Sequence, residues 1–120
     1  MPRTYPKPTL IIILLLSFSF ILSCSTTKDK KPNHPSKLLR EAKRFYKVGA
    51  PERAKNNINM IMEDFPDSNE RIAALMLLAD VHYREEEYEE AKFRYQKFTE
   101  LYPAHKYVDR AHFYKAMSNF

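Results

Sequence analysis

Few side chains in this sequence could do chemistry on their own. The chain has one cysteine, Cys24, which cannot form an internal disulfide, so its thiol needs another explanation. Four histidines show no spacing with cysteine or carboxylate residues that would suit a metal ion: His34, His82, His105 and His112. The sequence also lacks a glycine-rich loop and any serine–histidine arrangement that would assemble a catalytic site. We therefore expect no metal, no cofactor and no enzymatic activity.

Cys24 ends a segment that is typical of an export signal. Two basic residues precede an uncharged apolar stretch of 13 residues, 10–22, and polar residues follow Cys24 at once. Crossing a membrane takes about 20 apolar residues, so an uncleaved membrane anchor is the less favoured alternative.

The four residues that end at Cys24, Ile-Leu-Ser-Cys, resemble a bacterial lipobox, although Leu22 departs from the small or β-branched residue usual at its place. The resemblance implies a signal peptide over 1–23 and a covalent lipid on Cys24, and the alternative is a plain signal peptide with an incidental thiol. Ser25 resembles the outer-membrane class of lipoproteins, since aspartate at that place retains enteric lipoproteins in the inner membrane. We expect the chain on the periplasmic face of the outer membrane, with residues 24–35 as a flexible tether.

The net charge is +5, but from Cys24 onward 18 basic residues face 15 acidic ones, and the resulting +3 is too mild to imply a nucleic-acid partner. The basic excess is local, because one segment holds eight basic residues against only Asp29 and Glu41: Lys28, Lys30, Lys31, Lys37, Arg40, Lys43, Arg44 and Lys47. We interpret it as a basic segment near an anionic membrane surface, with ordinary solvated helix faces as the alternative. A later acidic run, 85–90, precedes a predicted helix, where carboxylates are solvated and favoured by the helix dipole, so we interpret it as structural.

The elements that must position these residues are predicted to be helical throughout. Gly49 is the only glycine, and no alternating run of Val, Ile and Thr indicates a strand. Apolar residues recur at helical spacing over about 36–47, from Pro51 towards Pro66, over about 70–85, over 89–101, and from near Val108 to the end. Asp67 and Glu70 are spaced as a capping box for the third helix.

A shift of 37 residues superposes the chain on itself. It aligns Leu38 with Leu75, Ala42 with Ala79, Tyr46 with Tyr83, Ala54 with Ala91, and Pro66 with Pro103. Chance rarely repeats alanines, an aromatic residue and a proline together, so the period indicates stacked helix pairs. The repeats are predicted at 36–66 and 67–103, with the start of a third at 104–120.

These residues resemble the tetratricopeptide repeat. The resemblance rests on Leu78, Ala79, Tyr83, Tyr88, Ala91, Tyr95 and Pro103, with a degenerate earlier copy at Ala42, Tyr46, Gly49, Ala54 and Pro66. The longer period and the segments 65–68, 101–105 and 108–114 look like the start of the BamD (ComL) family of outer-membrane assembly lipoproteins. A periplasmic Tol-associated coordinator of cell division has similar repeats, normally without a lipidated cysteine.

The family resemblance covers residues 24–120 and implies an all-α, tetratricopeptide-like solenoid of two helix pairs plus a fifth helix. Family members continue with further repeats, so we expect this chain to be the N-terminal part of a longer protein. The alternative is that the fifth helix acts as a cap.

One face of the first helix in each repeat lies away from the predicted packing stripe. Its residues are Leu39, Lys43, Tyr46, Lys47, Met76, Asp80, Tyr83, Arg84, Arg110, Phe113, Met117 and Phe120. In tetratricopeptide arrays this face lines the concave groove. Aromatic, methionine and basic side chains together suit an extended peptide with apolar anchors and a negative end, although some of them could simply contact neighbouring helices.

The resemblance implies a binding subunit of the β-barrel assembly machinery. Its partners would be other subunits of that machinery and unfolded outer-membrane proteins, with the membrane reached through the lipid. The alternative function is an envelope-organising lipoprotein that gathers peptidoglycan or division factors.

Overall fold

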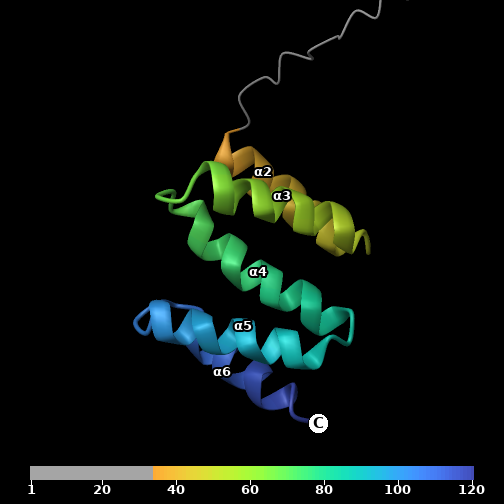
Figure 1. Cartoon of the computed structure of the whole chain (residues 1–120), viewed down its shortest axis with the longest axis vertical. Coiled ribbons are helices and arrows are strands. Elements are labelled where there is room, and N and C mark those ends of the chain that lie inside the picture. Colours follow the sequence, from red (N-terminus) through yellow and green to blue (C-terminus); the bar gives the residue numbers. More distant parts are fainter. Residues whose placement is uncertain (1–33) are drawn as a thin grey trace, which may run out of the picture. The chain divides into compact units, whose positions relative to one another are not determined.

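The computed structural model describes residues 34–120, which form five helices and no strand (Figure 1). Helix α2 spans Pro35–Lys47, α3 spans Pro51–Asp64, α4 spans Glu70–Arg84, α5 spans Tyr88–Leu101, and α6 spans Val108–Met117. The predicted all-α fold of two helix pairs and a fifth helix is confirmed. No helix within this part of the chain combines the length and the apolar character needed to cross a membrane.

Helices α2, α4 and α5 each differ from the predicted bounds by one residue at one end, and α6 ends three residues before the predicted end. Helix α2 already begins at Pro35, which suits a first turn because its missing N–H is not needed there. The His34 ring caps this helix by accepting a hydrogen bond from the backbone N–H of Ser36 at 3.3 Å. Helix α6 ends at Met117 and not at the chain end, since the next residues form a turn in which Asn119 N–H bonds to the Ala116 carbonyl.

The predicted capping box before α4 is wrong. Asn69 stands at the N-cap and makes no side-chain capping bond, because a turn that starts at Phe65 keeps Asp67 outside the helix. The carboxylate of Glu70 instead accepts a hydrogen bond from the Ser36 hydroxyl at 2.5 Å, which joins the start of α4 to the start of α2.

The 37-residue period of the sequence is also a period of the backbone. Adding 37 to both ends of α3 gives both ends of α5. Gly49 has φ 72° in the turn after α2, and Glu86 has φ 63° at the equivalent position after α4. The left-handed backbone is thus a property of the repeat, which glycine satisfies freely in the first copy and glutamate adopts under strain in the second.

Helix α4 is the central element of the described stack, with core residues on both sides. Its buried residues are Ala74, Met76, Leu77, Leu78, Ala79, Asp80 and Val81. One core joins it to α2 and α3 through Leu38, Ala42, Phe45, Ala54, Ile58 and Ile61. The other joins it to α5 and α6 through Ala91, Tyr95, Phe98 and Ala111. Burial on two sides explains why α4 lacks a clear polar face.

The repeating alanines lie where helices approach each other closely. Ala42, Ala54, Ala79 and Ala91 each have 0% of their surface exposed. A larger side chain at such a contact would hold the helices apart, so these positions agree with the close packing predicted from the repeat.

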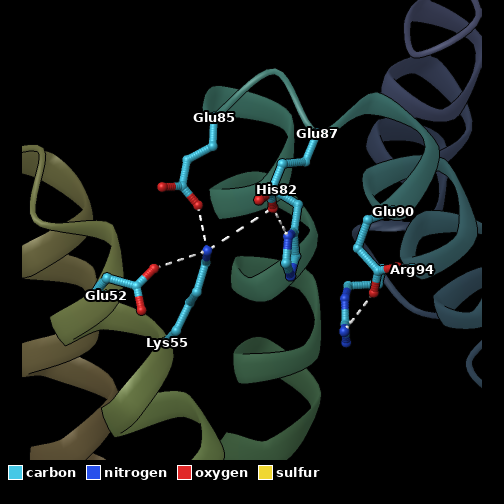
Figure 2. Close-up of polar contacts among 7 residues, drawn as sticks. All are labelled: Glu52, Lys55, His82, Glu85, Glu87, Glu90 and Arg94. Carbon is cyan, nitrogen blue, oxygen red and sulfur yellow. Dashed lines mark hydrogen bonds and ion pairs between the residues drawn. The ribbon is translucent and has the colours of Figure 1, made fainter.

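Part of the acidic run holds the turn between α4 and α5 against α3 (Figure 2). Lys55 of α3 contacts Glu85 at 2.5 Å and Glu87 at 3.9 Å, besides Glu52 of its own helix at 3.2 Å. The hydrogen bond with Glu85 raises the pKa of Lys55. His82 contacts Glu87, and this hydrogen bond lowers the pKa of that carboxyl group. Glu85 and Glu87 therefore stabilise the fold as ion-pair partners of Lys55.

Candidate protein-binding groove

Two adjoining depressions lie over the first helices of the repeats, and together we call them the groove. The first has a volume of about 210 Å³ and is lined by Lys43, Tyr46, Lys47, Ala73, Met76, Leu77, Asp80, Tyr107 and Arg110. The second has a volume of about 290 Å³ and is lined by Tyr46, Asp80, Tyr83, Arg84, Tyr95, Arg110 and Tyr114. Three residues line both depressions, so the two are neighbours along one surface.

The repeat explains why these residues meet. Tyr46 and Tyr83 are equivalent positions on α2 and α4, the first helices of successive pairs, and stacking the pairs brings them to the same side. Helix α6 is the next first helix, and it adds Arg110 and Tyr114 to that side. The helical register of each repeat sets the side on which its residues lie, and the stacking of the repeats brings these residues together.

A buried polar network forms the floor of the groove. Asp80 is only 8% exposed, and its carboxylate accepts a hydrogen bond from the Tyr95 hydroxyl at 2.8 Å. The guanidinium of Arg110 donates to the other carboxylate oxygen. The network joins α4, α5 and α6 through one carboxylate, because each residue comes from a different helix.

Both groups that contact the Asp80 carboxylate have raised pKa values. Burial raises the pKa of Tyr95, and the nearby negative charge of Asp80 raises it further. Burial lowers the pKa of Arg110, but the hydrogen bond to Asp80 and the nearby charges of Asp80 and the tyrosines together outweigh it, so the pKa of the guanidinium is raised. Burial also raises the pKa of Tyr46. Near neutral pH, Tyr46 and Tyr95 therefore keep their protons, and Arg110 stays charged and paired with Asp80.

Tyrosine rings form most of the groove wall. The rings of Tyr83 and Tyr114 meet edge to face with centroids 5.0 Å apart, and Tyr95 stacks on Tyr114 at 5.8 Å. Tyr83 also contacts Tyr88 at 5.5 Å. Such rings offer large, rigid contact area and a polar hydroxyl at little cost in side-chain entropy, which suits recognition of a peptide.

Two of the four basic residues predicted for the groove already have a polar partner in the fold, and two have no carboxylate partner within the described residues. Arg84 donates to the Tyr46 carbonyl at 2.5 Å and lies over the Tyr46 ring at 5.2 Å, while Arg110 is paired with Asp80. Lys43 and Lys47 are exposed and form no ion pair with a carboxylate of residues 34–120. A negative ligand would therefore meet the two lysines first.

The structure brings eight of the twelve predicted groove residues together and places four elsewhere. Leu39 lies beside the groove, in a wide depression over α2. Phe113, Met117 and Phe120 are 59%, 40% and 101% exposed and line neither depression. Their helical spacing matches Arg110, but on α6 the groove is lined by Arg110 and Tyr114, and these three residues lie outside both depressions.

Met76 and Asp80 line the groove, but they are buried. The prediction that they point away from the packing stripe is wrong, since Met76 is 2% exposed and belongs to the core of α4, α5 and α6. The reason is that α4 packs on both sides, so positions that would face solvent on an outer helix form a floor here.

Five groove residues were not selected from the sequence: Ala73, Leu77, Tyr95, Tyr107 and Tyr114. Tyr95 is a position of the repeat motif, Tyr114 ends the segment 108–114 that resembles the family, and Tyr107 precedes the helix that carries its neighbours. A signal for Tyr114 was present, because it lies four residues after Arg110 and therefore on the same helical face. No pattern pointed to Tyr107, whose position depends on the turn before α6.

The arrangement can bind but offers little for catalysis or metal coordination. Within residues 34–120, no three or more His, Cys, Asp or Glu side chains gather where they could hold a metal ion. Cys24, the predicted lipidation site, lies outside the described residues.

Comparison with known proteins gives one family. The family model described as YfiO, outer membrane lipoprotein, matches residues 31–120, which are 90 of the 120 residues and include every described helix. No curated protein and no solved structure matches the chain significantly.

Proposed function

Because the chain belongs to the YfiO family of outer membrane lipoproteins, we propose that it is a lipid-anchored, protein-binding subunit of the outer-membrane β-barrel assembly machinery. In this role it takes part in the assembly and insertion of outer-membrane proteins. The family match over residues 31–120 is the observation that carries the proposal. The groove supports it, because a tetratricopeptide-like stack uses such a surface to receive part of another protein.

The occupant that fits the groove is an extended segment of an unfolded outer-membrane protein. Each depression, at about 210 and 290 Å³, has room for a large side chain, and the two adjoin at Tyr46. Aromatic side chains of the segment would lie against the tyrosine wall, and its terminal carboxylate would approach Lys43 and Lys47. Binding of this kind needs no catalytic group, and we infer a scaffold and not an enzyme.

The proposal places the lipid on Cys24 and the folded part on the periplasmic face of the outer membrane. If the chain is anchored in this way, it fractionates with the outer membrane and Cys24 incorporates a fatty-acid analogue. Loss of the label in Cys24→Ala would support this anchor, while labelling that survives the substitution would contradict it.

The test of the groove is a titration. A peptide that reproduces the last β-strand of an outer-membrane protein and ends in phenylalanine is added to the chain, and its binding is followed by fluorescence anisotropy. Tyr83→Ala removes part of the aromatic wall and is expected to weaken binding about tenfold or more, as truncation of an aromatic anchor typically does. Lys47→Gln is expected to weaken binding at low salt only, since an exposed charge is screened as salt rises.

Phe93→Ala is the matched control, because Phe93 is a 58% exposed aromatic residue of α5 that lines neither depression. It should leave the affinity unchanged. If Tyr83→Ala and Lys47→Gln behave like this control, the groove does not receive the peptide, and the envelope-organising function becomes the better account.

A further inference from the structure

The outer face of α2 carries an unusual concentration of positive charge. The helix has five basic residues against one carboxylate, whereas each of the other four helices is within one charge of neutral. The five are Lys37, Arg40, Lys43, Arg44 and Lys47, and all are exposed. We call them the basic face.

The basic face lies opposite the core. At about 100° per residue, the buried stripe of Leu38, Ala42 and Phe45 covers a narrow arc, and the five basic residues cover about 120° centred on the other side of the helix. The charges are thus gathered on the side of α2 that faces away from its core, and not spread around the helix. Figure 1 shows α2 at one end of that stack.

Within the described residues, the one contact that any of these charges makes is that of the Arg44 guanidinium with the Phe45 ring, 4.8 Å from its centroid. None of the five basic residues forms an ion pair with a carboxylate of residues 34–120. Four of them line a wide, shallow depression of about 500 Å³ together with Ser36, Leu39 and Glu70. Its one carboxylate, Glu70, is held by the Ser36 hydroxyl at 2.5 Å. The depression has room for a large anionic group and several cations to meet it.

We propose that the basic face of α2 docks on the anionic phospholipid headgroups of the membrane to which this lipoprotein family belongs. The face is cationic and carries no aromatic residue, whereas the centre of a protein–protein interface is typically apolar and aromatic. A surface of phosphate groups needs only such a distributed positive charge. The sequence position agrees, because only about ten residues, a span of at most ~35 Å, separate Cys24 from the start of α2.

Docking would set the orientation of the folded part on the membrane, and it goes beyond the proposed peptide binding. Lys37 and Arg40 line neither depression of the groove and make no ion pair within the described residues, so both can be changed without touching the groove. Each basic residue near an anionic surface strengthens binding about fivefold. Charge reversal of both is therefore expected to lower the ratio of docked to undocked chains by at least about 30-fold.

The test measures how close α2 comes to the lipid surface. The chain has no tryptophan, so Val48→Trp, at a 69% exposed position directly after α2, introduces a single reporter. The full chain is purified from cell membranes and reconstituted into vesicles of phosphatidylcholine, with or without phosphatidylglycerol, that contain a headgroup-labelled quencher lipid. Tryptophan quenching then reports docking, while the anchor keeps the protein on both kinds of vesicle.

We expect strong quenching with phosphatidylglycerol, weak quenching without it, and loss of the difference as salt rises. Lys37→Glu with Arg40→Glu should abolish the difference. Lys97→Glu with Lys106→Glu, the same change of charge at exposed positions outside α2, should preserve it. Equal quenching on both lipids, or an equal loss in the control pair, would overturn the proposal and leave an acidic protein as the better occupant. Peptide binding by the Lys37→Glu, Arg40→Glu chain, measured in parallel, separates this outcome from failure of the groove.

Discussion

The substitution Asp80→Ala tests most directly whether the buried polar network stabilises the groove. The Asp80 carboxylate is 8% exposed and serves both the Tyr95 hydroxyl, at 2.8 Å, and the Arg110 guanidinium. Replacing Asp80 with alanine leaves the hydroxyl of Tyr95, a residue with 0% of its surface exposed, without an acceptor. A buried polar group that loses its partner costs about 1–3 kcal/mol.

The arginine contributes less to the predicted loss. The Arg110 side chain is 44% exposed, so water can replace much of its interaction with the carboxylate, and we assign about 1 kcal/mol or less to this pair. The total for Asp80→Ala is then about 2–3 kcal/mol of unfolding free energy. For a domain of this size, that corresponds to a fall in Tm of about 10–20 °C.

Thermal and urea unfolding followed by circular dichroism would measure this loss. Asp80→Asn keeps an acceptor for Tyr95 and should cost clearly less than Asp80→Ala. In a Tyr95→Phe background, the cost of Asp80→Ala should fall by about 1 kcal/mol or more, because the hydroxyl that needs the carboxylate is gone. A cost of Asp80→Ala below about 0.5 kcal/mol, or one unaffected by Tyr95→Phe, would refute the network as a structural link.

Three further outcomes follow from the packing, the turns and the phenol groups. Ala79→Leu should lower the unfolding free energy by about 1–3 kcal/mol, because Ala79 is buried at a helix contact. Ala116→Leu, the same change at an exposed helical position, should change the unfolding free energy by no more than about 0.5 kcal/mol. Equal urea midpoints for the two variants would show that the packing register is wrong. Glu86→Gly should raise the unfolding free energy by up to about 1 kcal/mol, and Gly49→Ala should lower it by a similar amount, because both positions have positive φ. Changes of the opposite sign in differential scanning calorimetry would contradict the strain assigned to these positions. The pKa of Tyr95 is raised above its ordinary value of 10.0, so the stability that this phenol contributes is complete below pH 10.0 and is lost as the pH rises above it. Tyrosinate absorbance of this residue should therefore appear only together with loss of helical signal, and its appearance in a folded chain would argue against burial.

Much of the fold could be predicted because it depends on local and periodic features. Gly49 and Pro51 mark a helix end and a helix start, and the 37-residue shift relates one helix pair to the next. The alanines of the repeat are buried as expected, since only small residues suit the close helix contacts. None of these features requires knowledge of which helix lies beside which.

The groove was harder to predict because its details depend on contacts between repeats. Arg110 looked like a free positive charge on its own helix, and only the stacking of α6 on α4 reveals that Asp80 neutralises it. Met76 was expected to point away from the packing stripe, but it is buried. The reason is that α4 packs against other helices on both sides. Helical spacing alone could not tell that Tyr114, and not Phe113, forms the wall.

In the proposed function, the groove receives outer-membrane proteins during their assembly. A photocrosslinking amino acid placed at Tyr83, in the groove, or at Phe93, on α5 away from it, would report contacts in living cells while new outer-membrane proteins are being made. We expect crosslinks from position 83 to unfolded β-barrel proteins and no crosslinks from position 93 to these proteins. Crosslinks from position 83 only to peptidoglycan-binding or division proteins, or equal β-barrel crosslinks from both positions, would contradict it.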